Sequence, residues 1–88
     1  MSKISVILNI TVESKDLDDV SKALASLSEV IDVYEVTGES DLVAIVSADD
    51  VIGFRNMLKN DILKIDGIKT TVSSVIMYTH KKDGKNMD

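Results

Sequence analysis

The fold is decided by the stretch from Glu35 to Val46, which reads EVTGESDLVAIV. Two runs rich in β-forming residues, 30–36 and 42–46, flank the polar segment TGESD at 37–41. Glycine, serine and carboxylates are common in tight turns and unfavourable inside strands. We therefore predict a β-hairpin whose tip is this polar segment.

The hairpin tip combines groups that bind small polar molecules. Gly38 is able to adopt a positive φ angle, Ser40 supplies a hydroxyl, and backbone N–H groups lie next to an apolar strand. Glu39 and Asp41 add two carboxylates. One interpretation is a ligand site, and the other is an ordinary turn, since many hairpin tips have this composition.

Upstream of the hairpin, the period of the apolar residues predicts a strand and then a helix. Over 4–12 the apolar residues recur at every second position, with Ile7 as an exception, which is typical of a strand. From Asp16 to about Leu27 they follow a helical spacing, as Leu17, Val20, Leu24 and Leu27. Ser14 or Asp16 is expected to cap this helix.

Downstream of the hairpin, the same reasoning predicts a second helix and a last strand. Asp49 and Asp50 precede a helical pattern, Val51, Phe54, Leu58 and Ile62. The turn at Asp66-Gly67 is followed by an alternating segment at 68–78. We expect one domain at 1–80 and a disordered tail at 81–88, where KKDGKNMD shows no period.

The predicted order is βαββαβ, the ferredoxin-like α+β arrangement, in which two helices cover one face of a four-stranded antiparallel sheet. Its first and third strands are central, and 42–46 carries no polar side chain. Both faces of that strand therefore favour burial, although the helices cover only one. We expect a dimer or larger oligomer formed through the sheet; the alternative is an exposed apolar patch.

Composition limits the class of protein. An 88-residue chain without cysteine has neither a disulfide framework nor a thiolate metal site, and it lacks a secretory signal or an apolar span. We expect a soluble, cytoplasmic protein. The net charge of −5 argues against direct nucleic-acid binding, and the lysines at 81, 82 and 85 are expected to be solvated.

The sequence contains no motif for catalysis. It has no glycine-rich phosphate loop, no HExxH and no nucleophile elbow. His80 is the one histidine, and we expect it to be exposed and structural. We therefore expect no enzyme activity, no cofactor and no metal.

The motif T-G-x-x-D within EVTGESDLVAIV, together with IDGIKTTVSSVIMYTHK at 65–81, resembles the Lrp/AsnC (leucine-responsive, feast/famine) regulators. The similarity is to their effector-binding RAM domain and extends from about Ser2 to Lys81. The family's helix-turn-helix would precede Met1, so a stand-alone RAM domain is expected. Ser40 departs from the pattern, because members often carry an aromatic residue there.

The resemblance implies dimers formed through the sheets, tetramers or octamers built from them, and an amino acid bound in a cleft between dimers. By position, the hairpin side of the cleft is Gly38, Glu39, Ser40 and Asp41, and the strand side is Thr71 and Ser73. Amides near Gly38 would bind the ligand carboxylate, and Asp41 would bind its ammonium group. The two hydroxyls would complete its hydrogen bonds. The alternative for Asp41 is a side chain that caps the turn.

The resemblance thus implies a non-catalytic module for amino-acid binding and oligomerisation that modulates Lrp/AsnC transcription regulators. One alternative is an ACT-like regulatory domain, which shares the element order but has a glycine soon after the first strand. Another is a dimeric ferredoxin-like monooxygenase, for which Asn9, Tyr34 and His80 are the available cavity residues.

Overall fold

The computed structural model describes residues 3–87. The expected domain at 1–80 begins with Met1 and Ser2, and the expected tail at 81–88 ends with Asp88; these three residues lie outside the described part of the chain. Its body is a four-stranded antiparallel sheet in the order β2-β3-β1-β4. The strands are β1 (Ile4–Val12), β2 (Val30–Glu35), β3 (Leu42–Ala48) and β4 (Ile68–Val75). The predicted ferredoxin-like fold is confirmed, with β1 and β3 in the centre.

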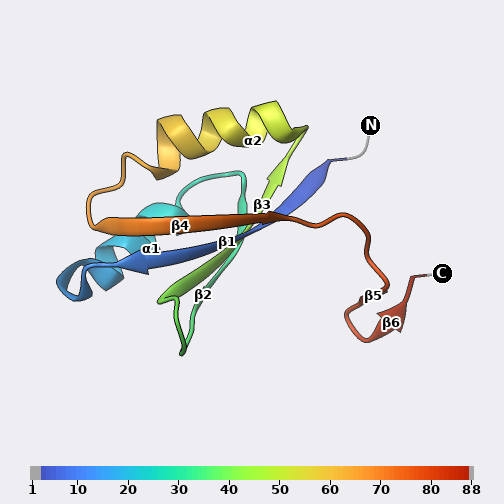
Figure 1. Ribbon diagram of the computed structural model, residues 1–88, viewed down its shortest axis with the longest axis horizontal. Helices are drawn as coiled ribbons and strands as arrows, with labels where there is room; N and C mark the ends of the chain where they lie inside the picture. The colour runs from blue at the N-terminus through green and yellow to red at the C-terminus, as the bar shows by residue number, and fades with distance from the viewer. Residues whose placement is uncertain (1–2, 88) are drawn as a thin grey trace.

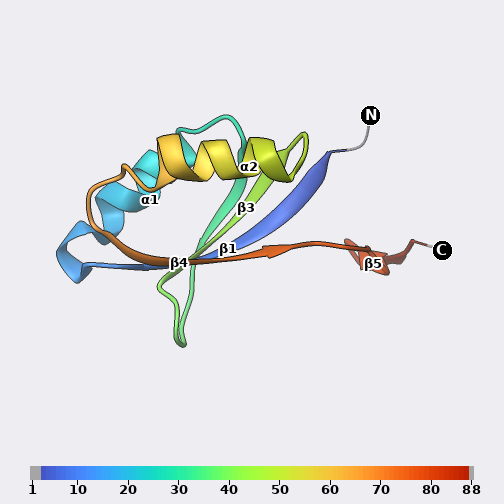
Figure 2. The same ribbon diagram turned by 45° about the horizontal axis from the view of Figure 1, so that its top comes forward.

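The helical segments all lie on one side of the sheet (Figures 1 and 2). They are η1 (Ser14–Asp16, a 3₁₀ turn), α1 (Leu17–Ala25), α2 (Val51–Met57) and η2 (Leu58–Ile62, a π turn). Asp50 caps α2, because its Oδ1 accepts a hydrogen bond of 2.7 Å from the Gly53 N–H. The expected cap of α1 was wrong, since no side chain caps η1 or α1.

The core fills the space between the helices and the sheet. Alternate residues of β1 and β3 point into it, because side chains alternate between the faces of a strand. The buried apolar side chains are Val6, Leu8, Ile10, Val12, Val20, Leu24, Leu42, Ala44, Val46, Ala48, Phe54, Met57 and Ile62.

The other side of the sheet, here called the open face, has no helix over it (Figure 2). Its central residues are half-buried, and they pair across the strands as Ile7 with Ile45 and Asn9 with Val43. On the edge strands it carries the more exposed Tyr34 and Val72. A mostly apolar surface with hydroxyl and amide groups is therefore open to solvent in one copy of the chain.

The start of β4 is fixed by Gly67. Its φ angle is +100°, and its carbonyl accepts a hydrogen bond of 2.9 Å from the Glu13 N–H. A Cβ at this position would lie 2.5 Å from the Cβ of Asp16. Only glycine therefore permits this close approach without a shift of the backbone.

The last described segment differs from the sequence-based expectation. The β4 strand ends at Val75 rather than Tyr78, although the Ile76 N–H still donates to the Ser5 carbonyl at 2.9 Å. Within the segment expected to be a disordered tail, β5 (Lys81–Lys82) pairs with β6 (Lys85–Asn86). Asp83 and Gly84 both have positive φ angles, 50° and 80°, as a type I′ hairpin turn requires. The Asp-Gly pair was the overlooked signal.

Candidate functional site

A hollow of about 630 Å³ lies on the open face beside the β2–β3 hairpin tip. Strands β1, β3 and β4 form its floor, and the hairpin tip projects from the open-face side of the sheet beside it (Figure 2). Its lining residues are Asn9, Thr11, Val36, Thr37, Glu39, Ser40, Val43, Thr70 and Val72.

The floor of the hollow is a polar amide between two apolar side chains. Asn9 pairs in register with Val43 on one side and with Val72 on the other. No side-chain hydrogen bond among residues 3–87 uses the Asn9 carboxamide. Next to it, the Thr11 and Thr70 hydroxyls bond to each other. The Asn9 carboxamide is thus the polar group of the floor that is free to bind a ligand.

The rim of the hollow comes from the hairpin tip. Thr37, Glu39 and Ser40 line it, and Gly38 turns the chain with a φ angle of +110°. Within the described chain, no backbone hydrogen bond uses the N–H groups of residues 37–40. Glu39 has no salt bridge to any described residue. The rim therefore offers one carboxylate and several amide donors to a bound molecule.

Asp41 lies beside this rim but is committed to the backbone. Its Oδ2 accepts a hydrogen bond of 2.9 Å from the Val12 N–H, and its own N–H donates to the Ile10 carbonyl at 2.9 Å. Its carbonyl accepts from the Val36 N–H at 3.0 Å. The Asp41 side chain thus braces the hairpin against β1. This contact is neither the expected bond to a ligand nor the alternative, a cap of its own turn.

Thr71 and Ser73 are not brought to the hollow. They pair with Ile10 and Leu8, whose side chains are buried in the core, so they lie on the helix side of β4. The strand residues that reach the hollow are Thr70 and Val72. Within one copy, Thr71 and Ser73 therefore lie on the opposite face of the sheet from the hairpin tip. The resemblance placed the two sets across a cleft between copies of the chain, and that grouping stays a prediction.

Sequence reasoning named the rim residues Glu39 and Ser40 for the ligand site, and it named Asn9 only as a cavity residue of the alternative monooxygenase. It did not name Thr11 or Thr70, which also line the hollow. The signal for Asn9 and Thr11 was present, since they alternate with the core residues of β1 and so face away from the helices. The signal for Thr70 required the pairing of β1 with β4.

Two other features of the described chain bear on the choice of site. Among residues 3–87 there is no group of three or more potential metal ligands. A second hollow, of about 570 Å³, lies at the other end of the sheet near Ile31 and Met57, where Lys3 Nζ is 3.8 Å from Asp49 Oδ1. No helix in the described part of the chain is long and apolar enough to cross a membrane.

The chain is similar to proteins described as HTH-type transcriptional regulators and to solved structures of the same fold. An uncharacterised HTH-type transcriptional regulator of Pyrococcus abyssi is 28% identical over 80 residues, which are 91% of this chain and 54% of that protein. The chain therefore spans about half the length of the curated relative. A crystal structure of a protein from Thermus thermophilus is 28% identical with a TM-score of 0.84, covering 90% of this chain and 99% of that one.

A third similarity supports the fold alone. The feast or famine regulatory protein of M. tuberculosis, in a structure complexed with L-methionine, is 24% identical with a TM-score of 0.80, covering 97% of this chain and 57% of that one.

The family model of the Lrp/AsnC ligand-binding domain matches residues 5–85, nearly the whole sequence. This chain belongs to the Lrp/AsnC ligand-binding domain family.

Proposed function

We propose that this chain is a non-catalytic module that binds a free amino acid in the hollow of the open face, assembles through that face, and modulates Lrp/AsnC-type transcription regulators. The observation that carries the proposal is the hollow itself, which combines apolar side chains and a free carboxamide in its floor with a carboxylate and unused turn amides at its rim.

These groups match the parts of an amino-acid zwitterion. Glu39 is a countercharge for the ammonium group, and the amides of residues 37–40 are donors for the carboxylate. Val43 and Val72 offer an apolar surface to the side chain. The volume falls within the roughly 300–1,000 Å³ of pockets that hold small molecules. Of the residues expected from the sequence, Gly38, Glu39 and Ser40 stay in the proposed site, and Asp41 supports it.

A second copy is part of the proposal because one copy gives the hollow a floor and a rim but no roof. The open face around it is apolar at Ile7 and Ile45, and monomers rarely leave such a surface uncovered. A sheet packed on this face removes water from the hollow and strengthens its electrostatic contacts. Dimers and larger even-numbered assemblies are the expected species.

The role in regulation is supported by the family and by its relatives. The Pyrococcus relative is described as an HTH-type regulator, and this chain corresponds to about half of it. The proposed module acts on such a regulator by joining its assembly. Because the M. tuberculosis structure contains L-methionine, amino acids are the first ligands to test.

The test is calorimetric titration of the protein with each of the twenty amino acids, followed by Glu39→Gln against any that binds. Removing this exposed countercharge is expected to weaken binding roughly 10-fold, at the lower end of the cost of a charged hydrogen bond. Glu35→Gln is the matched control, because Glu35 pairs with Leu42 and does not line the hollow. Binding that is unaffected by Glu39→Gln excludes this site, and no binding at millimolar concentration refutes the sensing role.

A further inference from the structure

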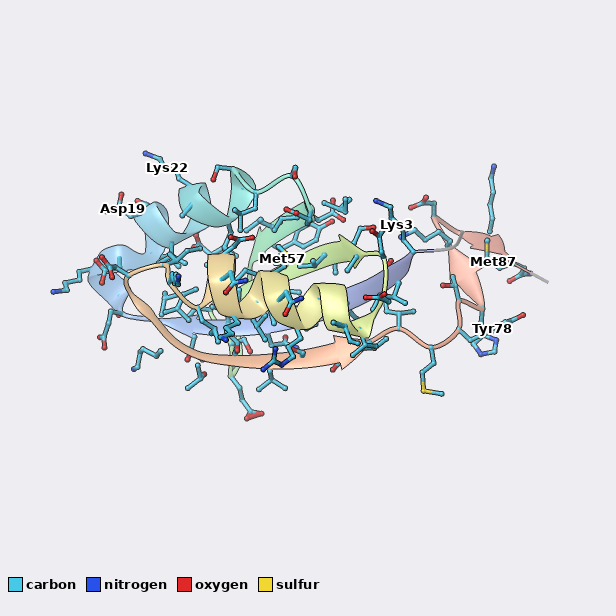
Figure 3. The ribbon with its side chains drawn as sticks, turned by 90° about the horizontal axis from the view of Figure 1, so that it is seen from above. Lys3, Asp19, Lys22, Met57, Tyr78 and Met87 are labelled. Carbon is cyan, nitrogen blue, oxygen red and sulfur yellow. The ribbon has the colours of Figure 1, made fainter. Side chains whose placement is uncertain are left out.

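Residues 76–87, here called the arm, project from the body of the protein (Figures 1 and 3). The arm continues the direction of β4 beyond the end of the sheet and closes in the β5–β6 hairpin. Its apolar side chains are exposed, with Met77 at 94%, Tyr78 at 64% and Met87 at 52% of their full accessibility. The arm therefore carries an apolar surface that no part of its own body covers.

Few interactions within the arm stabilise its conformation in water. The β5–β6 ladder has two residues in each strand, and a two-stranded hairpin without a packed face is at best marginally stable. Its internal supports are a hydrogen bond of 3.0 Å from the Met87 N–H to the His80 carbonyl and the edge-to-face rings of Tyr78 and His80, 4.8 Å apart. A hairpin of this size requires another surface to pack on.

The opposite charges of the arm and the body favour a second copy of the chain as that surface. The arm carries Lys81, Lys82 and Lys85 against Asp83, a net charge of +2. The whole chain has a net charge of −5; Asp88, which follows the arm, contributes −1, so the body at 1–75 carries −6. A basic arm on an acidic body is complementary to a second copy of the same chain.

The arm also leaves the sheet beside the open face. Val72 and Ser74 face the open side of β4, and Ile76 continues that alternation while its N–H is still bonded to Ser5. The base of the arm is therefore continuous with the open face, which is where the proposed function places the second copy.

We propose that the arm is a clasp between two copies of this chain: it crosses to the second copy, buries Met77 and Tyr78 against it, and places its lysines over the acidic surface of that copy. This inference rests on the proposed assembly through the open face. By the two-fold symmetry typical of such dimers, each copy gives one arm and receives one.

The first experiment is limited trypsin digestion across a concentration series that spans the dimer dissociation constant measured by sedimentation. Cleavage after Lys81, Lys82 and Lys85, followed by mass spectrometry, is expected to slow at least about 10-fold as the dimer forms, since a bound arm must be released before cleavage. Protection that does not depend on concentration means that the arm packs on its own body. Rapid cleavage at every concentration means that the arm is free. Either result overturns the clasp.

The second experiment removes the arm or reverses its charge. A chain ending at Ile76 keeps the bond to Ser5 and is expected to dimerise about 10- to 100-fold more weakly, the loss for one or two buried apolar side chains. The triple variant K81E/K82E/K85E is expected to weaken the dimer roughly 10-fold at low salt, with the effect fading near 1 M salt, where charges are screened within about 3 Å.

The matched control is K15E/K22E/K64E, which reverses three exposed lysines outside the arm and gives the same net charge of −11. It is expected to weaken the dimer less than the arm variant at every salt concentration. Equal effects of the two triple variants, or a truncated chain that dimerises like the wild type, refute the clasp while leaving the assembly in place. A wild-type chain that is monomeric by sedimentation refutes the proposed assembly itself.

Discussion

Replacing Asp41 with alanine distinguishes a bracing carboxylate from a ligand-binding one. The variant removes the 2.9 Å hydrogen bond to the Val12 N–H and leaves that half-enclosed amide without its partner. A hydrogen bond to a charged group contributes about 1.5–3 kcal/mol, so we expect the free energy of unfolding to fall by about 2 kcal/mol. In a domain of this size, that corresponds to a decrease in Tm of roughly 8–16 °C.

The measurement is thermal and urea unfolding followed by circular dichroism, at one protein concentration because self-assembly shifts the apparent stability. The urea midpoint is expected to fall with an unchanged slope. Glu39→Ala is the matched control, since it removes the same charge from the same hairpin tip without breaking a bond to the body of the protein; it is expected to change Tm by less than about 2 °C. If Asp41→Ala is as stable as Glu39→Ala, the bond to Val12 does not brace the hairpin and our account of Asp41 is wrong.

Three further predictions concern the fold, the assembly and the charge. Gly67→Ala is expected to lower the free energy of unfolding, measured in urea, by at least about 2 kcal/mol, because the new side chain has a positive φ angle and its Cβ lies 2.5 Å from that of Asp16. Gly38→Ala should lower it by about half as much, because Gly38 also has a positive φ angle but a Cβ there meets no atom within 4 Å. Ile45→Lys on the open face is expected to give monomers in sedimentation with the fold intact, whereas Ile52→Lys on α2 should leave the assembly unchanged. Mobility-shift titration at physiological salt should show no sequence-specific DNA binding, because the net charge is −5; a specific shift would contradict the proposed dependence on a partner regulator.

Most of the fold was predictable because local patterns determine it. The β1 strand was placed correctly by its period of two, and the α2–η2 segment by its helical spacing after Asp50. The hairpin between β2 and β3 followed from turn chemistry around Gly38. The resemblance to the Lrp/AsnC family, stated from two short segments, is confirmed by a match over residues 5–85.

The hairpin of the arm was not predicted because its strands are very short. Its hairpin has two-residue strands, too short to show an alternating pattern, so the lysines dominated the interpretation of the segment. The Asp83-Gly84 pair was a valid turn signal without the flanking apolar alternation that normally accompanies it.

The sequence by itself determined the order of the elements, the two central strands and the polar hairpin tip, because each depends on side-chain periods and turn residues that are close in the chain. Only the tertiary structure decided which hydroxyls share a face with that tip. The register between β1 and β4 shifts at Thr11 and Val12, so that Ile68 and Thr71 both lie on the core side although three positions separate them. Such a bulge breaks the period of two without a local sequence signal, and it becomes visible only when the partner strand is in place.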